Sequence, residues 1–134
     1  MLKPSGVVVI DGVRPWDKPS SLPDLNTSVQ EKKANGIAHN AWFGDVYKTV
    51  SFLIESHPEL DVRIVGNLVG ERYCQAVVKL VGNEKPKMIP NYSEMIRNIR
   101  WEDVFASDLE PMWDHKRELE VDPQNIAEWL LPRR

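Results

Sequence analysis

The sequence predicts an α+β fold in which a small sheet, of about three to five strands, packs against one long amphipathic helix. Three observations predict it: a β-branched run at 7–10, helical spacing of apolar residues over 41–56, and a second β-branched run at 61–65. The 134 residues fit a single globular domain, residues 1–134, with a proline-rich loop near 14–23.

The segment 41–56 is the element that the pattern predicts most strongly. Its apolar residues recur at the spacing of one wide helical stripe: Trp42, Phe43, Val46, Tyr47, Val50, Leu53 and Ile54. Asn40 is a suitable N-cap for this helix, and Pro58 ends it.

Two further elements are predicted before that helix. Residues 5–10 are expected to form a buried strand, because four β-branched residues follow one another and the turn pair Asp11-Gly12 closes the run. Pro23 is expected to open a short, exposed helix through Lys33, with Gly36 as its left-handed end.

Residues 71–81 are compatible with two structures. As a strand, they form an antiparallel hairpin with 62–69, and their β-branched content favours this interpretation. As a helix, they complete an α/β alternative in which the strands at 7–10 and 61–65 lie parallel, joined by a right-handed crossover. The hairpin is preferred, so α+β is the predicted class and α/β the alternative.

The C-terminal third is predicted to contain two short helices. Asn91 with Glu94 three residues later resembles a capping box and begins a helix over 92–100. Asp122 and Pro123 begin another over 123–131. The intervening residues 106–121 are expected to be irregular and acidic.

Composition narrows the class of protein. The single cysteine, Cys74, excludes an internal disulfide framework and favours a reducing, cytoplasmic location. The longest apolar run near the N-terminus has four residues, too few for a membrane span, so no membrane partner is expected. The net charge of −3 makes nucleic acid an unlikely partner.

The charge is unevenly distributed along the chain. Residues 102–122 contain eight Asp or Glu and two Lys or Arg, interleaved with large apolar residues. Apolar anchors within a charged rim are typical of protein interfaces. We therefore predict a non-enzymatic protein-binding module (an adaptor, inhibitor or immunity-type protein) whose partner presents a basic surface. The predicted contact residues are Phe105, Asp108, Glu110, Met112, Trp113 and Asp114.

Two other functions remain open at this point. A small α/β enzyme or ligand-binding domain for a phosphorylated or nucleotide-like compound would use Asp11, Gly66, Asn67 and Gly70, with His39 or His57; it requires 71–81 to be helical. A nucleic-acid accessory protein would use the basic region 63–100, which contains seven Lys or Arg.

The sequence contains no pattern specific to a catalytic or metal centre. The three histidines, His39, His57 and His115, lack the spacing that places two ligands on one helix face. Cys74 lies in an apolar segment, where burial makes a thiol unreactive. No catalytic residue, metal or cofactor is therefore assigned, and whether the protein is an enzyme stays open.

Overall fold

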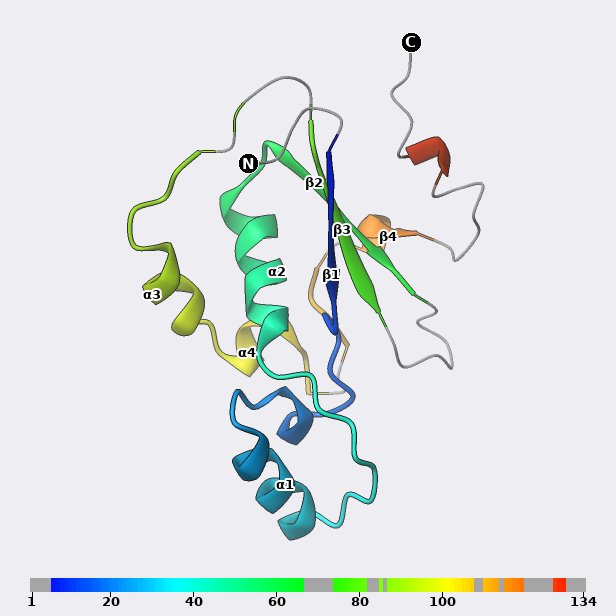
Figure 1. Cartoon of the computed structure of the whole chain (residues 1–134), viewed down its shortest axis with the longest axis vertical. Helices are drawn as coiled ribbons and strands as arrows, with labels where there is room; N and C mark the ends of the chain where they lie inside the picture. The colour runs from blue at the N-terminus through cyan, green and yellow to red at the C-terminus, as the bar shows by residue number, and fades with distance from the viewer. Residues whose placement is uncertain are drawn as a thin grey trace.

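The computed structural model describes residues 6–66, 74–81, 85, 87–107, 110–113, 115–119 and 127–129. Figure 1 shows a twisted sheet with helix α2 along one side and helix α1 at one end of the molecule. The strand order is β1-β3-β2-β4, with β1 at Val7–Asp11, β2 at Leu60–Val65, β3 at Gln75–Leu80 and β4 at Glu118–Leu119. The predicted α+β class is confirmed.

Strand β3 is the centre of the sheet. It pairs antiparallel with β2 on one side, with Leu60 opposite Leu80, and antiparallel with β1 on the other, with Val8 opposite Val78. The predicted hairpin is thus confirmed, and the helical alternative is wrong for 75–80. Strands β1 and β2 point the same way, but β3 separates them, so they do not form a parallel pair.

The main core lies between α2 and one face of the sheet. Helix α2 spans Val46–Ser56, and its Tyr47 and Val50 are buried together with alternate residues of β2 and β3: Val62, Ile64, Ala76 and Val78. Alternation along each strand places these four on the same face. The buried thiol of Cys74 also belongs to this cluster, as its apolar neighbours predicted.

Helix α2 begins later than the sequence predicted. Asp45 occupies the N-cap position instead of Asn40, and Gly44 before it has a left-handed backbone with φ of 63°. Trp42 therefore lies outside the helix, and its indole Nε1–H donates to the carbonyl oxygen of Leu22 at 2.8 Å. The apolar pattern of the helix extends back to Trp42 and Phe43, but the backbone of residues 41–45 is not helical.

Strand β1 is not buried, contrary to the prediction. Val7, Val8 and Val9 are 40%, 44% and 58% exposed, and only Ile10 packs against the core. The physical reason is its position at the edge of the sheet, with β3 as its neighbour. A β-branched run indicates a strand, but it does not distinguish a central strand from an edge strand.

The long connection between β1 and α2 is an ordered lobe. It contains a 3-10 turn, η1, at Pro19–Ser21 and helix α1 at Leu25–Ala34, close to the range predicted. Asp24 caps α1 by accepting a hydrogen bond from the Thr27 amide at 2.9 Å. Gly36 has φ of 68°, as expected for the left-handed end of the helix.

Polar contacts hold this lobe together. His39 Nε2 donates to Asp17 Oδ2 at 2.5 Å, and His39 Nδ1 accepts from the Ala41 amide at 3.1 Å. The buried ammonium of Lys32 donates to the carbonyl oxygen of Ala41. Helix α1 thus directs Ser28 and Lys32, rather than an apolar stripe, toward the interior, consistent with its thin apolar content.

The predicted helix over 92–100 is present but shorter than predicted. Helix α3 spans Tyr92–Arg97, so it ends before Arg100. A separate helix that was not predicted, α4, spans Trp101–Val104; Arg100 before it is extended, and its amide donates to Asp103 Oδ2 at 2.8 Å. The turn η2 at His115–Arg117 and strand β4 were not predicted. Residues 127–129 are helical, and the rest of the predicted helix over 123–131 lies outside the described residues.

The second face of the sheet contacts the residues around Trp129. The Trp129 indole donates to Asp61 Oδ2 at 2.8 Å, and the Lys79 ammonium lies 4.4 Å from the centre of the Trp129 ring. A cation over an aromatic face is attracted by the ring quadrupole. Charged residues on this face of the sheet are thereby partnered.

The core assignment can be tested on one pair of strand residues. We expect Ile64→Ala, which empties a fully enclosed site, to lower the free energy of unfolding by about 2–5 kcal/mol. The matched change Val9→Ala on the exposed edge is expected to cost no more than about 1 kcal/mol. Urea denaturation measures both, and equal costs would contradict the assignment.

Candidate functional site

Four aromatic rings attach the acidic segment to α2. Tyr47 of α2 meets the rings of Trp101 and Phe105, each at 5.5 Å between centroids, and Trp101 stacks on Phe105 at 4.3 Å. Trp113 continues the chain, edge-on to Phe105 at 6.2 Å. Such pairs add about 0.5–1.5 kcal/mol each beyond their area burial. The cluster therefore fixes residues 101–107 and 110–113 against the helix.

The charges around the cluster affect the Tyr47 hydroxyl. Burial, together with the nearby carboxylates of Asp45, Glu102 and Asp103, raises the pKa of Tyr47 to about 12, against a hydrogen bond with Ser21 that lowers it. The hydroxyl consequently stays protonated at neutral pH. It serves as a packed, hydrogen-bonded core group.

The predicted partner-binding residues divide between the core and the surface. Phe105 and Trp113 are only 3% and 9% exposed, so they pack within the protein instead of standing out as anchors. Met112 is 55% exposed and Glu110 is exposed as well. Asp108 and Asp114 lie outside the described residues.

A small depression opens where α2, α4 and Met112 meet. Its volume is about 40 Å³, and it is lined by Ser51, Ile54, Glu55, Asp103, Val104, Met112 and Trp113. The lining thus combines two carboxylates with apolar and aromatic side chains. None of the lining residues is Lys or Arg.

The two carboxylates of the depression differ in how they are held. Asp103 accepts from the Arg100 amide and lies 3.7 Å from the Arg100 guanidinium, which fixes its orientation. Glu55 has no ion-pair partner among the described residues. The neighbouring Glu102 is paired with Lys18 at 2.7 Å, and this hydrogen bond lowers the pKa of the Glu102 carboxyl.

Of the seven lining residues, the sequence predicted only Met112 and Trp113 as contact residues. Asp103 lies within the acidic run that was noticed, but Glu55, Ser51 and Ile54 come from α2, far away along the chain. Their positions on the helix surface are visible in the sequence. The sequence does not show that Asp103 and Met112 lie across the depression from them, because this depends on how the aromatic cluster packs.

The helix that the alternative ligand site requires does not form over residues 75–80. Asp11 and Gly66 do lie at the same end of the sheet, but Gln75 of β3 stands between Asp11 and Val65 in the register. Residues 75–80 are strand, not the helix that was to present its amides to an anion. Asn67 and Gly70 lie outside the described residues.

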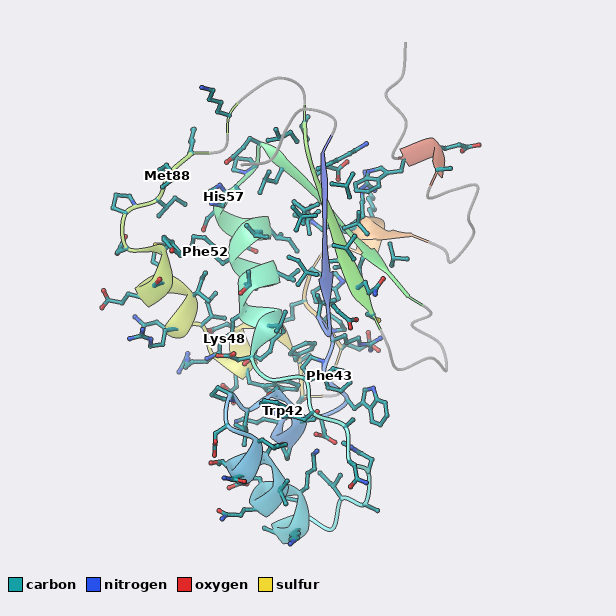
Figure 2. The ribbon with its side chains drawn as sticks, in the orientation of Figure 1. Trp42, Phe43, Lys48, Phe52, His57 and Met88 are labelled. Atoms are coloured by element: carbon teal, nitrogen blue, oxygen red, sulfur yellow. The ribbon has the colours of Figure 1, made fainter. Side chains whose placement is uncertain are left out.

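The two described histidine side chains are each paired with a carboxylate. Both ring nitrogens of His39 are hydrogen-bonded, one to Asp17 and one to the Ala41 amide. His57 is buried at the end of α2 beside Phe52, as Figure 2 shows. Among the described residues, no cluster of three or more His, Cys, Asp or Glu has the arrangement of a metal site.

The His57 pair stabilises a junction between elements. His57 Nδ1 lies 2.6 Å from Glu59 Oε1, which also accepts from the Lys87 amide at 3.0 Å. Burial raises the pKa of Glu59, but the hydrogen bonds from His57 and from backbone amides lower it by more, so it lies below its ordinary value. These contacts connect the turn after α2 to the segment that precedes α3.

A larger cleft lies in the N-terminal lobe. Its volume is about 570 Å³, within the range of small-molecule sites, and it is lined by Lys18, Pro19, Leu22, Thr27, Glu31, Asn35 and Ile37. Several of its polar groups already have partners within the chain: Lys18 with Glu102, Thr27 with Asp24, and Asn35 with the Glu31 carbonyl. The carboxylate of Glu31 makes the cleft unfavourable for a phosphate.

The residues of the basic region are dispersed. Arg63 pairs with Asp61 at 2.8 Å, Lys79 contacts Trp129, and Arg100 lies beside Asp103. Arg72 lies outside the described residues. The described members therefore occupy different parts of the fold.

Comparison with known proteins gives no match to a protein-family model, to a curated protein or to a solved structure. The described part of the chain contains no helix with the length and apolar character that crossing a membrane requires.

The Glu59 contacts predict a pH dependence of stability. Because the folded-state pKa of Glu59 lies below its ordinary value of 4.5, the ionised carboxylate stabilises the fold above that pH, and the stabilisation is lost as pH falls through the folded pKa. We expect Glu59→Gln to be less stable than the wild type at pH 7. The difference in free energy of unfolding should shrink below about pH 4.5. A difference that is the same at pH 7 and pH 3 would contradict this.

Proposed function

We propose that this chain is a protein-binding module whose acidic depression receives an arginine or lysine side chain from a partner with a basic surface. One observation carries the proposal: Glu55 and Asp103 line a depression that also contains the side chains of Met112 and Trp113. Adaptor, inhibitor and immunity-type roles are all compatible with such a surface.

The size of the depression favours a side chain over a metabolite. Its volume of about 40 Å³ is far below the roughly 300–1,000 Å³ typical of small-molecule pockets. The tip of one side chain is a ligand of suitable size. A partner protein would supply that tip from a larger contact surface.

The lining fits the chemistry of a cationic side chain. Arginine and lysine combine an apolar stem with a charged head, so they bind best where carboxylates and apolar groups adjoin. Met112 is exposed and offers a polarisable contact for the stem, while the small exposed part of Trp113 lines the depression beside it. Glu55 and Asp103 neutralise the charge.

The surroundings of the depression extend the acidic surface. Glu110, two positions before the lining residue Met112, is exposed, and so is Glu102 before Asp103, although Glu102 is paired with Lys18. A concentration of one sign of charge accelerates association with a partner of the opposite sign, and salt weakens the effect. Binding by this surface is therefore expected to decrease as ionic strength rises.

The proposal predicts selective binding of an arginine peptide. We expect the tripeptide acetyl-Gly-Arg-Gly-amide to perturb the Trp113 indole and Met112 methyl resonances in NMR titrations, with a dissociation constant in the millimolar range of about −4 kcal/mol. The matched acetyl-Gly-Glu-Gly-amide should leave them unchanged. The perturbation should decrease between 20 and 500 mM salt, roughly from a 20 Å to a 4 Å screening length.

Two charge-reversal variants separate the site from the general acidity of the protein. Glu55→Lys should abolish the response to the arginine peptide, whereas Glu94→Lys, an exposed glutamate on α3, should retain it. Equal loss in both variants would show that net charge, rather than the depression, governs binding. Full retention in Glu55→Lys would refute the proposed site.

A further inference from the structure

Among the described residues, no strand pairs with the outer edge of β1. Three consecutive valines, Val7, Val8 and Val9, are 40–58% exposed, although together they form a regular strand paired to β3. An edge strand presents unpaired N–H and C=O groups from every second residue. This edge is therefore both apolar and rich in hydrogen-bonding groups.

Within β1, the usual protection of an edge strand is limited to the charge of Asp11 at its end. Edge strands commonly include a lysine, a proline or a bulge that prevents pairing with another chain. The residues 7–10 include neither a charge nor a proline, and their pairing to β3 runs without interruption from Val7 to Asp11. At the opposite edge, β4 has only two residues, which limits pairing there.

We propose that β1 pairs antiparallel with β1 of a second copy of this chain. The two four-stranded sheets then join into one continuous sheet across a twofold axis. This surface is separate from the acidic depression, which is built from α2, α4 and Met112, so the two proposals stand independently.

The twofold symmetry restricts the register. Residues that face each other across an antiparallel pair both direct their backbone groups to the partner, or both away from it. In two identical strands they must therefore be an even number of positions apart, and the axis passes through one residue. An axis at Val8 places Val7 opposite Val9 of the second copy and keeps valines together on both faces.

The charged residue Asp11 also favours an axis at Val8 and a second copy of this chain as the partner. An axis at Val9 would instead bring Asp11 opposite Val7 of the second copy and bury a carboxylate against a valine. With the axis at Val8, the two Asp11 residues stand at opposite ends of the new pair, and no like charges meet. The apolar run thus complements itself.

The pairing side chains are divided between the two faces. Val8 is opposite Val78 of the core, so it lies on the face that carries α2, while Val7 and Val9 lie on the other face. The dimer would cover apolar side chains on both faces of the sheet. Because only five residues form the edge, we expect a weak, concentration-dependent dimer.

Sedimentation velocity on the full chain tests the pairing. The wild type should shift from monomer toward dimer between about 10 µM and 1 mM, a range typical of weak association. Val8→Lys places two ammonium groups opposite each other on the axis and should remove the dimer. Val81→Lys changes a valine that is 55% exposed at the end of β3 and should leave the dimer intact.

A cross-link tests the register without a charge. Opposite residues in an antiparallel pair have Cα atoms about 4.5–5.5 Å apart, which is within disulfide range. Val8→Cys should therefore form a disulfide-linked dimer on mild oxidation, and Val81→Cys should not. A wild type that stays monomeric at 1 mM, on the order of the weakest specific association, would overturn the proposal, and so would equal cross-linking of the two cysteine variants. If the protein stays monomeric, the alternative occupant of the β1 edge is a strand of another protein.

Discussion

The packing of Tyr47, Trp101, Phe105 and Trp113 is the interaction on which the candidate site depends. These rings draw a segment rich in carboxylates onto α2, where charge alone would favour a fully solvated chain. Backbone hydrogen bonds then close the segment on itself, with the Met112 amide donating to the Val104 carbonyl and the Ala106 amide to the Glu110 carbonyl, each at 2.8 Å. As a result, the carboxylate-rich segment is held in one position beside α2.

The N-terminal lobe is held together by polar contacts instead of aromatic packing. It orders the connection between β1 and α2 through a chain of polar contacts from Asp17 through His39 and Ala41 to Lys32. Buried polar groups are costly when unpaired, so each member depends on the next. Trp42 attaches this chain to η1 through the Leu22 carbonyl, and Figure 2 shows it between the lobe and α2.

Local patterns in the sequence predicted the parts of the fold that local physics determines. The β2–β3 hairpin, α1 and most of α2 follow from β-branched content, capping residues and helical periodicity. The exposure of Val7–Val9 could not be predicted in the same way, because an apolar run looks alike at the centre and at the edge of a sheet. That property depends on strand order.

In the candidate site, too, some features follow from local sequence patterns and others depend on how the elements pack. The acidic character of 102–122 is plain in the sequence, and Met112 lies on the surface as expected. Whether Phe105 and Trp113 face inward depends on Tyr47 and Trp101, which lie on other elements. The contribution of Glu55 from α2 appears only when those elements are packed together.

The most direct test is to locate an arginine side chain on the protein. Intermolecular nuclear Overhauser effects would be measured between the arginine methylenes of a bound Gly-Arg-Gly peptide and the aromatic and methyl protons of the protein. We predict contacts to Trp113 and Met112. Contacts instead to the exposed Trp42 and Met88, which Figure 2 shows on other parts of the surface, would contradict the account.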